Sequence, residues 1–206
     1  MPSLKLMLEK VSRVPHWPPD QSNPTRHWGF TIYRTYYGPS SDDNWDKLLE
    51  TAKKEAMEVL MKEGEDENGE KLKPFFLLDP RSDEALLSGV DRRGLIKIYK
   101  DQIGGPPMPT FQLVFLYADE DTLNQVIQGI FTLKAVDAEE EPREDIPPEE
   151  GDEFFGRPRY WGWMKMETRR IMELWAALAW SHTHHVITWT EFQANLEEVW
   201  EGWDAD

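Results

Sequence analysis

Short segments rich in aromatic and β-branched residues alternate along this chain with longer segments whose apolar residues recur at helical spacing. Segments of the first kind, such as WGFTIYRTYYG at 28–38, are typical of β-strands. Segments of the second kind, such as the one that follows SSDD at 40–43, are typical of amphipathic helices. The order is not a strict strand–helix alternation, because two predicted strands are consecutive. It predicts an α+β fold with an antiparallel or mixed sheet and helices packed mainly on one face, arranged as a ferredoxin-like or extended ferredoxin-like sandwich.

The predicted elements are placed by their apolar periodicity and by the glycines, prolines and capping residues that bound them. Strands are expected at 28–38, 74–80, 111–118, 131–138, 159–166 and 184–189. Helices are expected at 41–63, 91–103, 120–130, 167–180 and 190–203. The helix at 120–130 is expected to turn Leu123, Val126, Ile127 and Ile130 inward. The segment EDENGEKLK at 65–73 is predicted to be a polar turn, and residues 1–12 fit either a short helix or an edge strand.

Acidic residues are concentrated in two places, and this divides the chain. Of the net charge of −16, residues 137–153 account for −9 and residues 191–206 for −6. The chain length and the four prolines between Pro15 and Pro24 predict an N-terminal arm at 1–26 and one α+β domain at 27–206. Within that domain we expect a flexible acidic loop at 138–157 and an acidic C-terminal helix at 190–203.

Charge and composition also bear on partners and chemistry. Localised negative charge disfavours nucleic acid and anionic membranes, so we expect neither as a partner. The chain has no cysteine, which excludes disulfides, thiol nucleophiles and cysteine-ligated metals. The N-terminal residues are charged and no apolar run reaches the length of a membrane span, so we expect a cytoplasmic protein. No phosphate loop, nucleophile elbow or dinucleotide fingerprint occurs, and we expect no cofactor.

Three stretches, taken jointly, carry a resemblance. They are WGFTIYRTYYG–SSDDNWDKLL at 28–49, FQLVFLYADEDTL at 111–123 and YWGWMKMETRRIMELWAAL at 160–178. Their order and spacing resemble a large group of uncharacterised intracellular proteins of filamentous fungi, over roughly 28–180. This chain departs from that group in its acidic, tryptophan-containing C-terminus and its long acidic loop. The resemblance implies a fungal source and a cytosolic setting, and it implies no activity or catalytic residue.

Arg34 stands in an otherwise apolar and aromatic predicted strand. It could bind a carboxylate or phosphate group of a ligand, with Tyr33, Tyr36 and Tyr37 as hydroxyl donors. Alternatively, it could form a salt bridge with a neighbouring acid or lie across the solvent face of the sheet, and we favour this structural role. Asp42, Asp119 and Asp121 lie at predicted helix starts, where capping explains them.

The histidines and tryptophans provide weaker candidates. On an extended segment His182 and His184 of the His182–His185 cluster share a face and could bind a divalent metal, although a polar surface loop is the simpler interpretation. Trp161 and Trp163 alternate onto one strand face and could form part of an aromatic ligand site. An aromatic core or a dimer interface is the favoured alternative.

Two functions remain open at this point. The first is a non-catalytic interaction or regulatory protein that binds a protein partner or self-associates. The second is a cofactor-independent small-molecule enzyme, an isomerase, lyase or cyclase, with a pocket near Arg34 and the histidine cluster.

Overall fold

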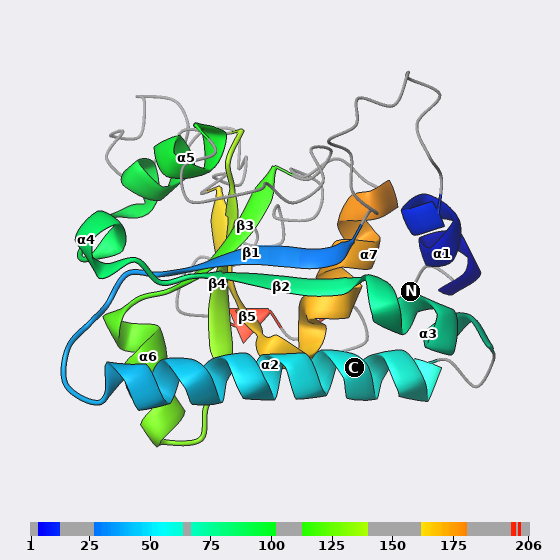
Figure 1. Ribbon diagram of the computed structural model, residues 1–206, viewed down its shortest axis with the longest axis horizontal. Coiled ribbons are helices and arrows are strands. Elements are labelled where there is room, and N and C mark those ends of the chain that lie inside the picture. Colours follow the sequence, from blue (N-terminus) through cyan, green and yellow to red (C-terminus); the bar gives the residue numbers. More distant parts are fainter. Residues whose placement is uncertain are drawn as a thin grey trace, which may run out of the picture.

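The computed structural model describes residues 4–12, 27–63, 67–101, 113–139, 162–180, 199–200 and 202 (Figure 1). The strands are β1 (Trp28–Arg34), β2 (Phe76–Arg81), β3 (Val114–Ala118), β4 (Thr132–Asp137), β5 (Trp163–Glu167) and β6 (Val199–Trp200). The helices are α1 (Leu4–Ser12), α2 (Ser41–Glu63), α3 (Glu67–Leu72), α4 (Glu84–Leu87), α5 (Arg92–Lys100), α6 (Glu120–Ile127) and α7 (Ile171–Trp180). Short 3₁₀ turns, η1 (Lys73–Phe75) and η3 (Thr168–Arg170), precede β2 and α7.

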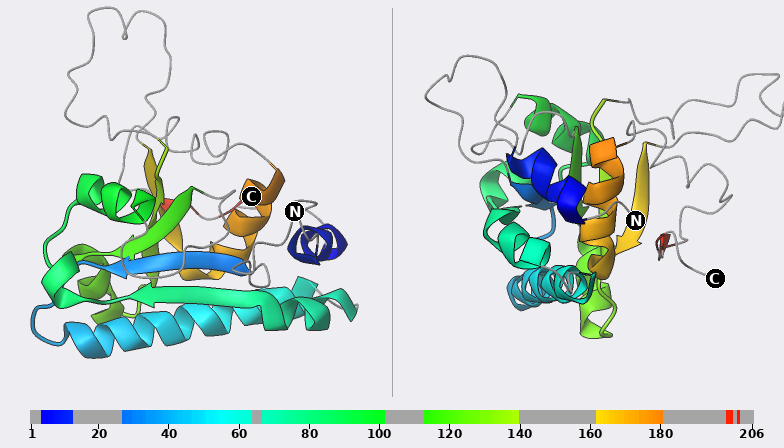
Figure 2. Two further views of the ribbon diagram at one scale, coloured as in Figure 1. Left: turned by 45° about the horizontal axis from the view of Figure 1, so that its top comes forward. Right: turned by 90° about the vertical axis from the view of Figure 1, so that its right-hand side faces the viewer.

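One mixed sheet organises these elements, in the order β2-β1-β3-β4-β5-β6. β1 runs parallel to both β2 and β3, as Figure 2 shows for β1 and β2 beside α2. β4 is antiparallel to β3 and to β5, and β6 is parallel to β5. The predicted α+β class with a mixed sheet is confirmed. The ferredoxin-like arrangement is not confirmed, because β1 and β2 pair directly, whereas a split βαβ unit places another strand between its parallel strands.

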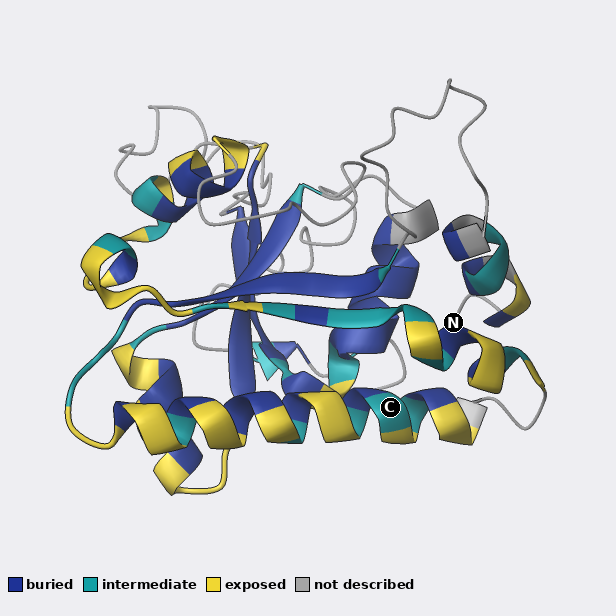
Figure 3. Ribbon diagram, in the orientation of Figure 1, coloured by how far each residue is buried: buried dark blue, intermediate teal, exposed yellow. Residues whose placement is uncertain are grey.

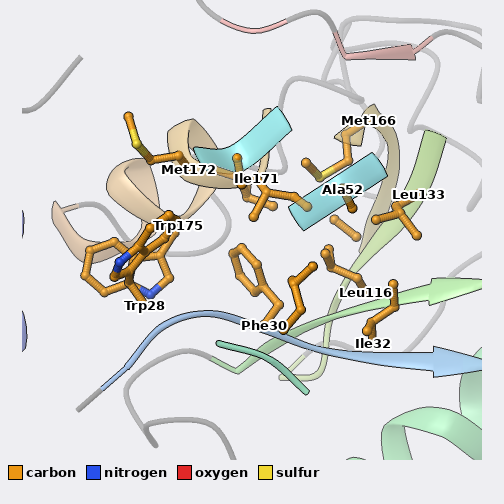
Figure 4. Close-up of a cluster of buried hydrophobic side chains, with 14 of the residues drawn as sticks. Trp28, Phe30, Ile32, Ala52, Leu116, Leu133, Met166, Ile171, Met172 and Trp175 are labelled. Carbon is orange, nitrogen blue, oxygen red and sulfur yellow. The ribbon is translucent and has the colours of Figure 1, made fainter. Parts of the chain in front are cut away.

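The two faces of the sheet follow from the alternation of side chains along each strand. Phe30 and Ile32 of β1 and Leu116 of β3 lie on the first face, where they join a core with α1, α2, α3, α6 and α7 (Figure 4). Tyr33 and Phe115 lie on the second face and pack with α4 and α5. All residues of β3 are buried, as expected of a strand covered on both faces. Helix α2 shows one buried and one exposed stripe (Figure 3).

Most helices pack on the first face, as predicted, but α4 and α5 pack on the second face. Their position has a topological cause. The connection from β1 to β2 moves one way across the sheet, and the connection from β2 to β3 moves the other way. Crossover connections between parallel strands are almost always right-handed. When the chain reverses its direction across the sheet, the connecting helices must therefore lie on the opposite face.

Two local predictions near the first face need revision. Residues 67–72, within the predicted polar turn, form α3, because Leu72 is fully buried and its carbonyl oxygen accepts a 2.8 Å hydrogen bond from Trp28 Nε1. Residues 4–12 are helical, which decides between the two alternatives for that segment.

Helix α6 ends earlier than predicted. Leu123 and Val126 are buried as expected, but Ile127 and Ile130 are exposed by 67% and 45%. The helix ends at Ile127, and Gly129, with φ of 79°, then turns the chain towards β4. Ile130 therefore lies beyond the helical period on which its inward position was predicted.

The prediction of a C-terminal helix at 190–203 is wrong at residues 199 and 200. Val199 and Trp200 form β6, and Trp200 is buried against the edge of the sheet. Next to it, Gly202 has φ of 95°, and a Cβ there would lie 2.6 Å from Arg170 Nη1 and from Glu173 Oε2. Residues 190–198, like residues 140–157 of the predicted acidic loop, lie outside the described part of the chain.

Candidate functional site

The carboxyl ends of β1 and β3 form a topological switch point of the sheet. The two strands are parallel neighbours, with Arg34 opposite Ala118, and Thr35 N donates a 3.0 Å hydrogen bond to Ala118 O. From this edge the chain leaves β1 towards β2 and leaves β3 towards β4, in opposite directions. Ligands of open α/β sheets bind at such topological switch points.

Arg34 lies at this edge and is buried, with a side chain 5% exposed. Its Nε donates to Tyr36 O at 2.9 Å, and its Nη2 donates to Ser41 Oγ at 2.7 Å and to Asp42 Oδ1 at 2.6 Å. The guanidinium carbon also lies 4.4 Å from the centroid of the Tyr37 ring. These contacts connect the end of β1 to the start of α2. Arg34 thus stabilises the β1–α2 connection through groups of its own chain.

Tyr36 belongs to the same connection. Its phenol lies against Gly38, where a Cβ would be 2.0 Å from the Tyr36 hydroxyl oxygen, so a side chain at position 38 would displace the Tyr36 ring. Tyr33 points the other way, into the second face. Of the predicted ligand-binding residues, the structure therefore brings together Arg34 and Tyr36 in the β1–α2 connection, and it places Tyr33 on β1 and Trp163 on β5 in the core of the second face.

The second face carries an aromatic core around Phe115. Tyr33 meets the Phe115 ring edge-on with the centroids 5.4 Å apart, and the Tyr99 ring centroid lies 5.2 Å from that of Phe115. Burial raises the pKa of Tyr33 to about 12, with smaller opposing effects of Arg81 and Asp79. Burial likewise raises the pKa of Tyr99 and of Tyr117. These phenols therefore stay protonated and neutral at ordinary pH.

Two buried lysines lie beside this aromatic core. Lys134 of β4 and Lys165 of β5 are directly opposite each other in the sheet, with side chains 10% and 6% exposed. Lys134 Nζ lies 2.5 Å from Asp119 Oδ2, and Lys165 Nζ lies 3.2 Å from Asp121 Oδ2. Both aspartates come from the start of α6. We call these four residues the lysine–aspartate cluster.

Aromatic rings and a further cation border the lysine–aspartate cluster. Lys134 Nζ lies 5.7 Å from the centroids of the Tyr117 and Trp163 rings. The guanidinium carbon of Arg92, from α5, lies 4.4 Å from the Trp163 centroid. The cluster therefore places two ammonium groups, each paired with a carboxylate, beside aromatic faces.

Asp119 has two roles in the cluster. It caps α6 by accepting a 3.2 Å hydrogen bond from Thr122 N, and it also accepts from Lys134. Burial by itself would raise the pKa of Asp119, but the hydrogen bond and charge of Lys134, with the Thr122 N–H, outweigh it and lower the pKa below 3.8. The carboxylate is therefore ionised at neutral pH, as pairing with an ammonium group requires.

The lysine–aspartate cluster was not predicted, although its two lysines carry a signal in the sequence. Arg34 was singled out because it is a lone cation within an apolar predicted strand. Lys134 in LKAV and Lys165 in WMKM are lone cations of the same kind. Their being opposite each other depends on the register of β4 and β5, which the sequence does not state. Asp119 and Asp121 were explained as capping residues, which is correct for Asp119 and incomplete for both.

The remaining predicted site residues, Trp161, His182 and His184, lie outside the described residues. Among the residues that the structure describes, no group of three or more histidine, aspartate or glutamate side chains could hold a metal ion. None of the described helices combines the length and apolar composition needed to cross a membrane.

Comparison with known proteins finds no matching family model, no matching curated protein and no matching solved structure.

Proposed function

We propose that this chain is a non-catalytic interaction or regulatory protein that self-associates. The observation that carries the proposal is the pairing of its buried cations with acceptors of the same chain. Arg34 donates to Ser41 and Asp42, while Lys134 and Lys165 each pair with an aspartate of α6. These bonds attach the starts of α2 and α6 to the sheet. The role of the charged groups is therefore structural, and function is expected on the surface.

The turn after α6 is a candidate contact surface. Ile127 and Ile130 are exposed on either side of Gly129, and Phe131, next in the chain, is only partly buried. Exposed apolar groups that are close together are typical of surfaces that bind another protein. A cytoplasmic setting, as in the fungal proteins that the three sequence stretches resemble, is part of this proposal.

Light scattering coupled to size-exclusion chromatography tests the proposal. Full-length chain at micromolar concentration should elute with the mass of a dimer or larger assembly. A second measurement would compare Ile127→Ser with Gln128→Ser, a neighbouring exposed polar position, and only the first should weaken a contact at this turn. A chain that stays monomeric at every concentration and captures no partner in a pull-down would contradict the proposal.

A second candidate function is a cofactor-independent small-molecule enzyme, and the lysine–aspartate cluster is what favours it. Lys134 lies beside the Tyr117 and Trp163 rings, and a lysine ammonium group in such a setting can bind an anion. The Arg34 guanidinium already donates hydrogen bonds to Tyr36, Ser41 and Asp42 of its own chain. We therefore place such a site at the lysine–aspartate cluster and not at Arg34. A thermal-shift screen of anionic metabolites distinguishes the two functions, because a specific ligand raises the melting temperature. That increase should disappear in Lys165→Met if the cluster binds the ligand.

A further inference from the structure

Helix α5 has the opposite charge to the chain as a whole. Its sequence, RRGLIKIYK, contains two arginines, two lysines and no acid. The whole chain has a net charge of −16. By comparison, α2 begins with two aspartates in its first turn and carries both acids and lysines along its length. α5 is therefore a basic helix in an acidic protein.

Three of the four cations of α5 lie together on its exposed side. Arg93, Lys97 and Lys100 are all exposed, and their spacing places them within about 60° of one another around the helix axis. Leu95 and Tyr99, on the opposite side of the helix, are buried in the core of the second face (Figure 3). We call Arg93, Lys97 and Lys100 the basic stripe.

The basic stripe is unfavourable for the helix that carries it. Cations three and four positions apart on a helix repel each other, and Arg93 lies in the first turn, where the helix dipole favours acids. Lys54 of α2 has Glu58 one turn away as a partner. Within the described part of the chain, neither Lys97 nor Lys100 forms an ion pair. Positions that break such local rules without compensation are typical of functional surfaces.

From these observations we propose that the basic stripe binds an acidic segment of another protein. The proposal rests on the interaction role proposed above and adds a partner of stated chemistry, at a helix other than the turn after α6. Between Arg93 and Lys100 the helix rises about 10 Å. Side chains on one face of an extended peptide repeat at about 6.6–6.8 Å. Carboxylates at alternate positions of a peptide can therefore each reach a cation of the stripe.

The size of the basic stripe and the charge of the whole chain favour a short acidic segment over other anionic partners. A nucleic acid or an anionic membrane presents negative charge over an area much larger than one helix face. Such a partner would also meet the acidic remainder of the chain, which repels it. A short peptide contacts the stripe alone.

Fluorescence anisotropy of the full-length chain at low salt tests the proposal. The probe is a fluorescein-labelled peptide of alternating glutamate and serine, and the control peptide has glutamine in place of glutamate. We expect saturable binding of the glutamate peptide and no binding of the glutamine peptide. Lys97→Glu/Lys100→Glu reverses two charges of the stripe and should weaken binding about tenfold or more.

A matched variant on α2 separates the stripe from net charge. Lys53→Glu/Lys62→Glu changes the net charge by the same amount at two exposed positions and should leave binding nearly unchanged. Circular dichroism shows that both variants are folded. Equal weakening in the two variants, or no binding of the glutamate peptide to the wild type, would overturn the proposal. Tighter binding of phosphatidylserine vesicles or of an oligothymidylate than of the peptide would overturn it as well.

Light scattering of the same samples separates the basic stripe from self-association. Lys97→Glu/Lys100→Glu should keep the mass of the wild-type assembly, because the proposed contact at the turn after α6 is unchanged. A dimeric wild type that does not bind the glutamate peptide would overturn the stripe and leave self-association standing. A monomeric wild type that binds the peptide would overturn self-association and leave the stripe standing.

Discussion

Lys134 and Lys165 occupy directly opposite positions on β4 and β5, so the sheet places two buried ammonium groups side by side. Like charges in that relationship destabilise a sheet unless each is paired. Asp119, the N-cap of α6, pairs with Lys134, and Asp121, in the first turn of α6, pairs with Lys165. The ion pairs with Lys134 of β4 and Lys165 of β5 therefore hold the junction of β3 and α6 in position.

Removing one aspartate from this arrangement should be costly. Asp119→Ala leaves Lys134 buried without its carboxylate and removes the cap of α6, so we expect a loss of about 2–3 kcal/mol in the free energy of unfolding. Asp121→Ala is the control, because Asp121 is 52% exposed and its bond to Lys165 is longer, and it should cost less than about 1 kcal/mol. Urea denaturation of both variants measures the difference. Equal losses would show that the cluster does not hold the β3–α6 junction as described.

Acid should weaken the protein through the same residue. Because the pKa of Asp119 is lowered in the folded state, its stabilising contribution is present above the ordinary value of 3.8 and is lost as the pH falls through the lower folded-state value. The free energy of unfolding of the wild type should therefore fall more steeply below pH 4 than that of Asp119→Asn. Denaturation curves from pH 2 to pH 6 compare the two slopes, and parallel slopes would contradict the assignment.

Arg34 should not be replaceable by lysine, although the charge is kept. Lysine cannot reproduce the planar set of donors that reaches Tyr36 O and Ser41 Oγ together, and Arg34→Lys should cost about 2 kcal/mol. Asp42→Ala removes only the partner that is 88% exposed, and its cost should stay below about 1 kcal/mol. Thermal denaturation tests both. If Arg34 served only to bind a ligand, Arg34→Lys would leave stability unchanged.

Docking of β6 should depend on the absence of a side chain at position 202. Gly202→Ala combines a left-handed φ with a Cβ that overlaps the Arg170–Glu173 ion pair, so we expect a loss of about 2–3 kcal/mol. Gly129→Ala is the matched control, since Gly129 has a left-handed φ of 79° but no atom within 4 Å of its added Cβ. Its loss should reflect backbone strain alone, about 1–2 kcal/mol. Hydrogen exchange at Trp200 would show whether the larger effect arises in β6.

Local sequence patterns were sufficient for most helices and strands of this chain. The apolar period of α2, α5 and α7, the capping oxygen of Asp119 and the aromatic and branched residues of β1 and β3 are short-range signals, and each marks its element in the structure. Where the period extended past a glycine turn, as at Ile130, the same reasoning failed. Helix α3 was missed because its sequence is polar and its buried end at Leu72 is held by a distant residue, Trp28.

The candidate site depended instead on contacts between residues far apart in the chain. Nothing within β4 or β5 states that Lys134 will face Lys165, or that Asp121 lies near a lysine 44 positions later. Likewise, only the pairing of Val199 and Trp200 with β5 makes a strand of a segment whose periodicity is typical of a helix. Periodicity reports which side of a segment will be buried, whereas strand order and register depend on the partner that buries it.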